Sequence, residues 1–422
     1  MTLQTIAQLI MLATLILMIT GRTPIYMTAI TGAAISAIVA GFPLAGGQGM
    51  TVTKMIVSGL NPVIADMTGI LLFIGIMQAT GFLDVIIRDI VRVGNKIGGG
   101  VGVGAAGGVA AGVIGALTGF TQPVITAVIT GPAAVRLGVK PNQSAGIIAH
   151  AGHIGNLAGF THPTQVAILA TAGIGYGLFN VLGLIAAGSI FVMSAIRITI
   201  DMKRRGVKID AAEKERILKE IESREYSTTS WKAFFPFIVL VVGFIAGMPI
   251  FLVGLASAMA TMILAHSKPK EAEAAMMKGV SLIATPLVAT IGFLFMSTVI
   301  REIGMVNTMS TLVSPVMSIS PVLVLFGVAF LTGFMTQSYA ASVAVLVPFL
   351  QAGADPFAAA FAAASGASLI QYFLTGGPVA ALATVIPVIP GSDLKGANAF
   401  QRPSILFGCL VAFLITFCLN LL

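Results

Sequence analysis

"AHAGHIGNLAGFTHP", residues 149–163, holds three of the four histidines of a chain that is 57% hydrophobic and only 9% charged. The stretch is dominated by glycine and alanine and ends in Pro163, so it is a poor continuous helix. Apolar runs flank it, and several reach the roughly 20 residues that a helix needs to cross a bilayer. The stretch therefore predicts a helix broken inside the membrane, with its polar groups gathered at the break.

The composition excludes an ordinary soluble domain, in which about 25% of residues are charged. We expect an all-α polytopic membrane protein. Residues 1–22 have no basic residue before their apolar core, so they lack the start of a signal peptide and are predicted to be a retained first span. Cys409 and Cys418 are expected to be small apolar packing residues.

The two halves of the chain repeat each other on either side of the charged segment 201–226. Their landmarks occur in the same order, which predicts two similar modules. The matching pairs are 21–41 with 246–266, 117–132 with 331–348, and Pro141 to Pro163 with Pro356 to Pro378, which have equal spacing.

Charge indicates that these modules are inverted. An odd number of crossings in each module turns the second one upside down. With the N-terminus outside, all but Lys54 and Arg301 of the 23 Lys and Arg residues fall on the cytoplasmic side, as the positive-inside rule requires. We therefore expect two inverted repeats in a cell inner (plasma) membrane, with both termini outside and the linker 201–232 cytoplasmic.

The predicted layout has about ten transmembrane helices, two re-entrant hairpins and two broken helices. Residues 82–97 place their charges on one face and should lie in the membrane interface. The first repeat, 1–200, is divided into scaffold helices 3–97, hairpin 101–138, broken helix 142–175 and last span 177–198. The second repeat, 233–422, is divided into scaffold helices 233–315, hairpin 320–350, broken helix 357–388 and last span 403–421.

Paired interruptions at corresponding positions of two inverted halves point to a transporter's binding site. The interruptions are expected at the two hairpin tips and over residues 152–163 and 365–378. The helix ends created there offer N–H groups to an anion and carbonyl groups to a cation.

The pattern "TGFTQPVITAVITGPAAVRLGVKP" followed by "HAGHIGNLAGFTHPTQVAI" resembles the ion transporter superfamily. Its hairpin and break are most similar to those of lactate permeases, and the histidine and prolines at the break resemble gluconate symporters. Citrate and dicarboxylate transporters carry Ser-Asn-Thr at each hairpin tip. This chain has Thr121-Gln122-Pro123 and Thr336-Gln337-Ser338 there, which weakens the case for a sodium site. The resemblance implies a homodimer and an elevator mechanism, in which a transport domain slides against a scaffold carrying a carboxylate with H⁺ or Na⁺.

The candidate site residues are polar groups at the tips and breaks. Three histidines, His150, His153 and His162, are also candidates for proton coupling, because histidine titrates near neutral pH. The alternative for each is a structural tie at a helix end or turn. The predicted substrate-binding residues are Thr121, Gln122, His153, Asn156, Thr161, His162, Thr164, Thr336, Gln337, Ser338, Ser365, Ser368, Gln371 and Thr375.

The predicted function is symport of a small organic anion, with no catalytic residue, metal or other cofactor. A monocarboxylate or hydroxy acid is favoured over a C4-dicarboxylate or citrate, because no Arg or Lys is expected beside the breaks. The expected partners are the substrate, the coupling cation, lipid and a second copy of the chain; nucleic acid is not expected. "GVGAAG" (102–107) fits a nucleotide-loop pattern but lies in an apolar hairpin arm.

Three other functions stay open. A Na⁺/H⁺ or other cation antiporter of the same superfamily would need an acidic residue at mid-membrane, for which Asp66 is the best candidate. A membrane metal enzyme could use the three histidines as ligands. A channel is the third, and saturable, gradient-dependent uptake would argue against it.

Overall fold

A computed structural model describes residues 2–20, 23–58, 62–118, 121, 123–208, 211–222, 228–281, 284–308, 311, 320–350, 355–374 and 380–421. All regular structure in these ranges is helical. The first half contains α1 (Leu3–Thr20), α2 (Ile25–Val39), α3 (Val52–Val57), α4 (Pro62–Ala79), α5 (Phe82–Thr118), α6 (Val124–Arg136), α7 (Pro141–Ala149), α8 (Ala151–Ala158), α9 (Pro163–Ala172) and α10 (Leu178–Arg204).

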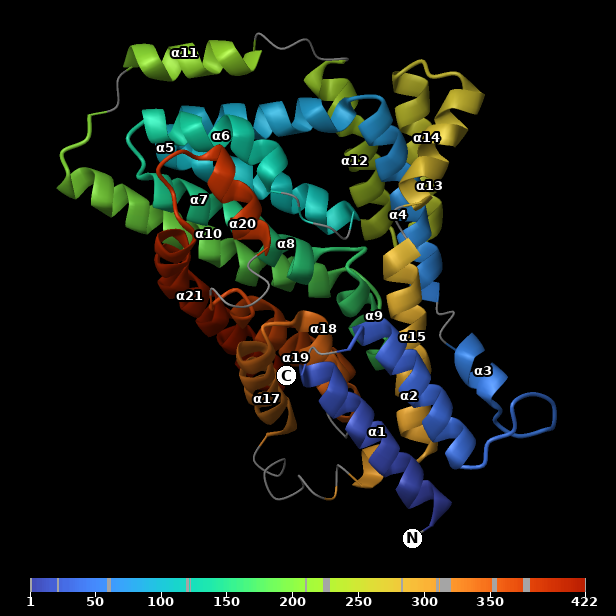
Figure 1. The fold of residues 1–422 in the computed structure, drawn as a ribbon. Helices are drawn as coiled ribbons and strands as arrows, with labels where there is room; N and C mark the ends of the chain where they lie inside the picture. Colours follow the sequence, from blue (N-terminus) through green and yellow to red (C-terminus); the bar gives the residue numbers. More distant parts are fainter. Residues whose placement is uncertain are drawn as a thin grey trace.

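The charged linker forms α11 (Ala211–Glu222), which lies along the edge of the molecule beside α5 and α6 (Figure 1). The second half contains α12 (Ser230–Ile245), α13 (Ile250–Leu264), α14 (Pro269–Ser281), α15 (Ala284–Glu302), α17 (Pro321–Thr336), α18 (Tyr339–Leu346), η1 (Val347–Phe349), α19 (Pro356–Ile370), α20 (Ala380–Val385), η2 (Ile386–Val388) and α21 (Leu394–Leu421).

Three of the described helices, α5, α10 and α21, are long and apolar enough to cross a membrane, and eight shorter apolar helices accompany them. The outer faces of α10 and α21 carry exposed large apolar side chains, among them Leu184, Val192 and Leu410. Contiguous exposed apolar surface on long helices is typical of contact with lipid. These features describe a multi-pass membrane protein.

The long helix α5 is two helices joined at a sharp bend. Gly99 lies at φ 53° and ψ −130°, a conformation that only glycine adopts readily. The chain doubles back there, so that a Cβ on Gly102 would lie 1.9 Å from the Gly94 carbonyl oxygen. The bend falls between the predicted interface helix 82–97 and the predicted hairpin from 101. The second part of α5 packs against α6, and these two form the arms of the first hairpin.

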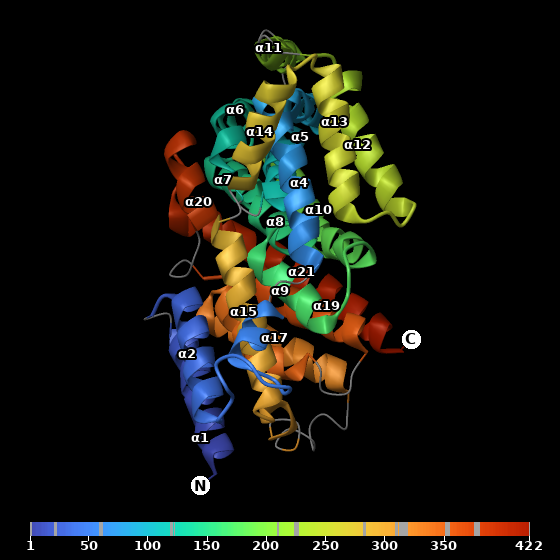
Figure 2. The ribbon, with the colours of Figure 1, turned by 90° about the vertical axis from the view of Figure 1, so that its right-hand side faces the viewer.

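The two halves exchange equivalent contacts. Helix α2 packs against α15, and α13 packs against α4, where a Cβ on Gly254 would lie 2.4 Å from the backbone of Gly69. The α1–α2 pair and the α12–α13 pair lie at opposite ends of the molecule (Figure 2). Such an exchange is what a twofold relation between inverted modules produces. The repeat itself stays a prediction, which this arrangement supports.

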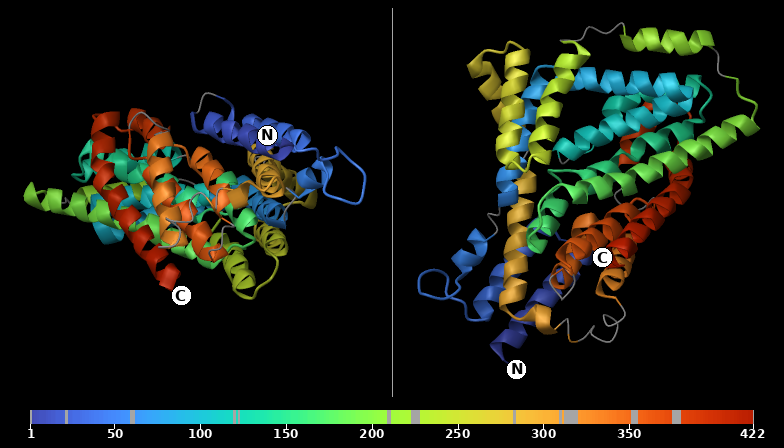
Figure 3. Two further views of the ribbon diagram at one scale, coloured as in Figure 1. Left: turned by 90° about the horizontal axis from the view of Figure 1, so that it is seen from below. Right: turned by 180° about the vertical axis from the view of Figure 1, so that it is seen from behind.

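The interior is built around the two interrupted helices. In α19 every residue from Ala358 to Ile370 is buried, as expected for a helix that is apolar on all sides. It packs on α17, while α8 packs on the second part of α5. The last helices of the halves, α10 and α21, run side by side along one face (Figure 3). This frame positions the breaks described next.

Candidate functional site

The first break is shorter than the sequence indicated. The backbone leaves the helical region at Gly159 and α9 begins at Pro163, so only residues 159–162 are irregular. His150 is still helical at φ −62° and ψ −10°, and the His153 N–H bonds to its carbonyl oxygen at 3.0 Å. His150 is therefore the junction residue between α7 and α8, and His153 lies on α8. The expected interruption over 152–163 is wrong for residues 152–158, which are helical.

Protein groups satisfy the irregular backbone of this break. The Asn180 amide donates to the carbonyl oxygens of Ala158 and Gly159, at 3.1 and 3.0 Å. The Tyr176 hydroxyl donates to the Phe160 carbonyl oxygen at 2.6 Å, and the Phe160 N–H reaches the first hairpin. In hydrocarbon an unpaired peptide group costs several kcal/mol, so the start of α10 allows the break to exist.

Unpaired polar atoms gather where α9 begins. The first turn of a helix has N–H groups with no intrahelical partner, and no side chain caps α9. Beside this helix start lie Thr161, Gln165 and, on α18, Tyr339, all at least 95% buried. Within the described ranges their side-chain oxygens and the Gln165 amide nitrogen have no hydrogen-bond partner, and neither does Nδ1 of His162.

Buried polar atoms are nearly always paired, so this cluster marks a place where a polar ligand group fits. The His162 ring lies against the Tyr339 ring, with 5.3 Å between centroids. Helix α9 packs on α19, α18 and α15, near the middle of the molecule (Figure 1). The cluster thus joins the first break to the second hairpin.

The three histidines have different surroundings. Both ring nitrogens of His150 are engaged, Nε2 with the Ser194 hydroxyl at 2.8 Å and Nδ1 with the Gln401 amide nitrogen at 3.4 Å. His153 is fully buried; its Nδ1 lies 3.3 Å from the His150 carbonyl oxygen. The His153 ring also interacts with the Leu369 carbonyl, yet Nε2 has no hydrogen-bond partner of ordinary geometry. The geometry makes His150 a tie between helices and leaves acceptor nitrogens on His153 and His162.

The second break begins at Gln371, later than the expected Ser365. Ser365 and Ser368 lie within α19, where the Ser365 hydroxyl bonds to the Phe361 carbonyl oxygen at 2.7 Å. The buried Ser368 hydroxyl has no partner in the described part of the chain. Of the expected interruption, residues 371–374 are described and 375–379 are not.

The second break meets α8, the helix that precedes the first break, through Tyr372. Its ring lies 4.7 Å from the His153 ring, and its hydroxyl accepts a hydrogen bond from the Asn156 amide at 3.2 Å. A Cβ on Gly152 would lie 2.8 Å from that hydroxyl, so glycine lets the ring approach α8. Asn156 and Gln371, expected to bind substrate together, are both engaged: Gln371 accepts from the Tyr339 N–H at 2.9 Å.

The second hairpin tip turns at Gln337, which has a left-handed backbone at φ 51°. Its side chain donates to the Phe334 carbonyl oxygen at 2.6 Å and accepts from the Leu374 N–H at 3.3 Å. The Thr336 hydroxyl lies 3.0 Å from the Ser342 hydroxyl and 3.2 Å from the Ser338 carbonyl oxygen. The tip is therefore fixed by its own turn and by the second break.

The predicted residues separate into three groups. His153, Asn156, Thr161, His162 and Thr164 lie along α8, the first break and α9, and they meet Gln371 and the second tip through Tyr372 and Tyr339. Thr121 lies at the other side of α8, where a Cβ on Gly155 would be 2.3 Å from its hydroxyl. Gln122 and Thr375 lie outside the described residues.

Sequence reasoning missed Gln165 and three tyrosines, Tyr176, Tyr339 and Tyr372. A signal was present: the chain has only five tyrosines, and these three flank the breaks or the second tip. Within the described ranges no three His, Cys, Asp or Glu side chains lie close enough together to hold a metal ion.

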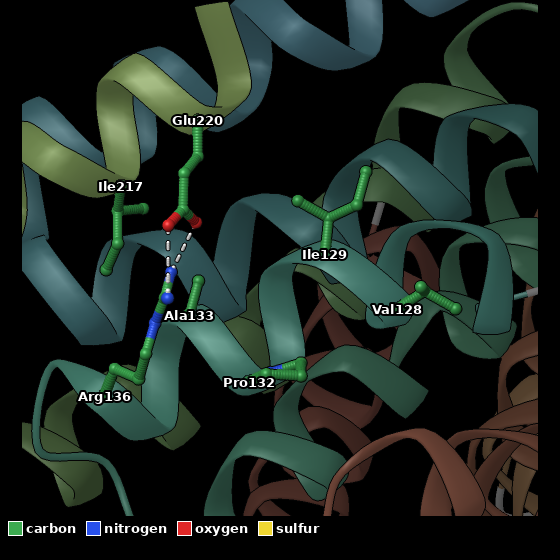
Figure 4. A pocket seen from close by; sticks show the side chains of 7 residues that line it. All are labelled: Val128, Ile129, Pro132, Ala133, Arg136, Ile217 and Glu220. Carbon is green, nitrogen blue, oxygen red and sulfur yellow. Dashed lines mark hydrogen bonds and ion pairs between the residues drawn. The ribbon is translucent and has the colours of Figure 1, made fainter. Parts of the chain in front are cut away.

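A separate cavity of about 270 Å³ lies at the edge of the molecule between α6 and α11 (Figure 4). Arg136 and Glu220 meet across it at 2.7 Å, and Glu213 reaches Arg136 at 3.4 Å. The hydrogen bond from Arg136 lowers the pKa of the Glu220 carboxyl below its usual value. This cavity is lined by α6 and the linker helix α11, and not by the breaks.

These features together define the fold of a membrane transporter. The chain is similar in structure to the YdaH transporter of Alcanivorax borkumensis, with a TM-score of 0.64, 14% identity and coverage of 97% of both chains. It is also similar to MtrF of Neisseria gonorrhoeae, described as illuminating a class of antimetabolite efflux pumps, with a TM-score of 0.61, 14% identity and coverage of 94% and 95%. The sequence matches no protein-family model and no curated protein.

Proposed function

We propose that this protein is a secondary active transporter of the ion transporter superfamily that carries a small organic anion together with H⁺. The observation that carries the proposal is the set of buried, unpaired polar atoms at the start of α9. In the proposed elevator movement of a homodimer, the broken helices and hairpins would slide against the scaffold helices, which they contact through pairs such as α9 with α15 and α18 with α1. The same helical frame makes transport a more economical explanation than catalysis.

The chemistry at α9 suits an anion. A helix start carries about half a positive charge, and its free N–H groups point toward the ligand. The Tyr339 and Thr161 hydroxyls and the Gln165 amide add hydrogen-bond donors around it. An organic acid has the negative charge that such a site would neutralise.

The histidines favour H⁺ over Na⁺ as the coupling ion. Nδ1 of His162, at the start of α9, has no hydrogen-bond partner in the described residues, and Nε2 of His153 on α8 has none of ordinary geometry. A proton taken up there would offset the charge of the carboxylate as both cross the membrane. The side-chain oxygens of Thr336 and Gln337, which a Na⁺ ion would use, already accept hydrogen bonds from the N–H groups of Ser338 and Leu374.

A cation antiporter needs an ionisable acid that is free to exchange its ion. Asp66 on α4 is half-buried, and its carboxylate accepts a hydrogen bond from the Phe251 N–H at 3.1 Å. It therefore caps the start of α13, which gives the acid a structural task.

Proteoliposomes containing the purified protein test this function. We expect saturable uptake of an organic acid from a panel that includes lactate, gluconate and succinate, driven by an inward H⁺ gradient and abolished by a protonophore. The variant that probes the site is Thr161→Val, an isosteric change that removes one unpaired hydroxyl and should raise the KM for the organic acid. Na⁺/H⁺ exchange without any organic acid would establish the antiporter instead, and a failure of every acid to bind or cross would reject the proposal.

A further inference from the structure

Arg402 lies beside the second break, where its side chain contacts Phe373. The predicted layout places it in the segment that precedes the last span. It belongs to α21 and is half-buried, whereas Lys395, at the start of the same helix, is exposed. Its Nε donates to the Phe373 carbonyl oxygen and to the Asn398 side-chain oxygen, both at 3.2 Å. The guanidinium carbon lies 5.5 Å from the centre of the Phe373 ring. These contacts fix the plane of the guanidinium group.

The terminal nitrogens of Arg402 make no hydrogen bond or ion pair within the described ranges. A guanidinium group has five donors in a rigid fork, and Nε supplies only one of them. The fork matches a carboxylate or another planar oxyanion with two parallel hydrogen bonds. A half-buried cation held in one orientation by carbonyl and amide oxygens, with its fork free, is suited to bind an anion.

Arg197 shows how a structural arginine differs. It is a half-buried cation near the far end of α10, and its Nη1 donates to the Phe400 carbonyl oxygen and to Ser404. Its guanidinium group also stacks on the Phe400 ring at 4.6 Å. A terminal nitrogen of Arg197 makes its hydrogen bonds to α21. In Arg402 these bonds are made by Nε, so the terminal nitrogens stay available to a ligand.

Arg402 is connected through two residues to α8, the helix that precedes the first break. Phe373 follows Tyr372, whose ring lies against His153. Asn398, which orients Arg402, also donates to the Tyr372 carbonyl oxygen at 3.1 Å. Arg402 therefore contacts Phe373, and His153 contacts the ring of the preceding residue, Tyr372.

We propose that Arg402 binds a second anionic group of the substrate, so that the transported ligand is a dianion such as a dicarboxylate. This inference rests on the proposed function. One carboxylate lies at the start of α9 and the other at the Arg402 fork. The sequence-based preference for a monocarboxylate depended on finding no basic residue beside the breaks, and the position of Arg402 removes that reason.

The test uses matched acids that differ by one carboxylate, butyrate with succinate and benzoate with terephthalate. Binding to purified wild type, Arg402→Gln, Arg402→Lys and the control Lys395→Gln is measured by thermal shift and by uptake into proteoliposomes. We expect wild type and Lys395→Gln to prefer the diacids. Arg402→Gln should lose about tenfold or more in affinity for a diacid, the worth of a charge-assisted bond, and change little for a monoacid; Arg402→Lys should be intermediate.

Wild-type affinity for diacids in a folded Arg402→Gln protein would overturn the inference. If that variant does not fold, the wild type decides: equal affinity for both members of each pair overturns the inference and leaves the proposed function standing. If the wild type neither binds nor transports any acid, the proposed function fails and this inference with it.

Discussion

The two breaks solve the same backbone problem with different chemistry. In each half an asparagine near the start of the last helix donates to carbonyl oxygens of that half's break, Asn180 in the first and Asn398 in the second. The first break is completed by the neutral hydroxyl of Tyr176, and the second by the cation of Arg402. The two breaks therefore have a similar asparagine contact, but a permanently charged side chain, Arg402, contacts the backbone of the second break, where the first has Tyr176.

The titratable groups show the opposite asymmetry. Histidines 150, 153 and 162 belong to the first half, and the positions matching His150 and His153 in the second half are Ser365 and Ser368. Serine does not titrate in this range, so the proposed proton coupling would involve the first half alone. In this proposal the titratable groups lie in one half, and the permanent charge of Arg402 lies in the other.

The largest expected effect comes from crowding the first break. A Cβ on Gly183 of α10 would lie 2.2 Å from the Leu157 carbonyl oxygen, just before the break, so Gly183→Ala must displace backbone. We expect a loss of about 2 kcal/mol or more in stability and little folded transporter, measured by the thermal midpoint and monodisperse yield in detergent.

Gly188→Ala is the matched control, because nothing lies within 4 Å of that position on the same helix. It should keep wild-type stability. Equal behaviour of the two variants would contradict the close approach of α10 to the first break, and the contrast between the breaks would lose its structural basis.

The next effect concerns the histidines. His153→Ala or His162→Ala removes a free acceptor nitrogen, and we expect uptake to fall about tenfold with a flatter pH dependence between pH 5 and 8, the range around the usual histidine pKa. The groups facing His153 are His150, the hydroxyl-bearing ring of Tyr372 and the Leu369 carbonyl. The measurement is initial uptake rate against external pH.

His150→Ala is the informative partner, since both of its nitrogens are engaged by Ser194 and Gln401. It should lower the thermal midpoint while keeping the shape of the pH profile. Unaltered transport in both His153→Ala and His162→Ala would contradict the proposed proton binding by these two histidines.

The sequence predicted the frame of the molecule better than its site. Apolar run lengths and the spacing of prolines are local signals, so the helices and the approximate positions of the interruptions followed from them. The length of each break did not follow from the sequence. His150 and Ser365 keep a helical backbone when their polar side chains are bonded inside the protein. The contact of Arg402 with the second break did not follow from the sequence either, because only tertiary packing distinguishes half-buried Arg402 from exposed Lys395 on the same helix. Tyr339 and Gln165 acquire their role from a contact between α9 and α18 that no spacing rule contains.

The smallest expected effect tests whether the asymmetry extends to the hairpins. Arg136, at the end of the first hairpin, holds linker helix α11 through Glu220 and Glu213, whereas the returning arm of the second hairpin, residues 339–350, has no charged residue. Arg136→Gln should speed hydrogen exchange in residues 211–222 modestly, because exposed ion pairs are weak and screened by salt. The control is Lys219→Gln, whose pair with Glu215 lies within α11.

The pH dependence of this contact has a definite sign. Arg136 lowers the pKa of Glu220 in the docked state, so the ion pair contributes fully above the usual carboxyl pKa of about 4.3. The contribution disappears as pH falls through the lowered value, when the carboxyl binds a proton. Exchange in α11, corrected for its intrinsic rate, should therefore rise in acid for the wild type and stay flat for Arg136→Gln. Identical acid profiles in the two proteins would mean that the apolar contacts of Ile217, a buried residue of α11 itself, hold the linker helix instead.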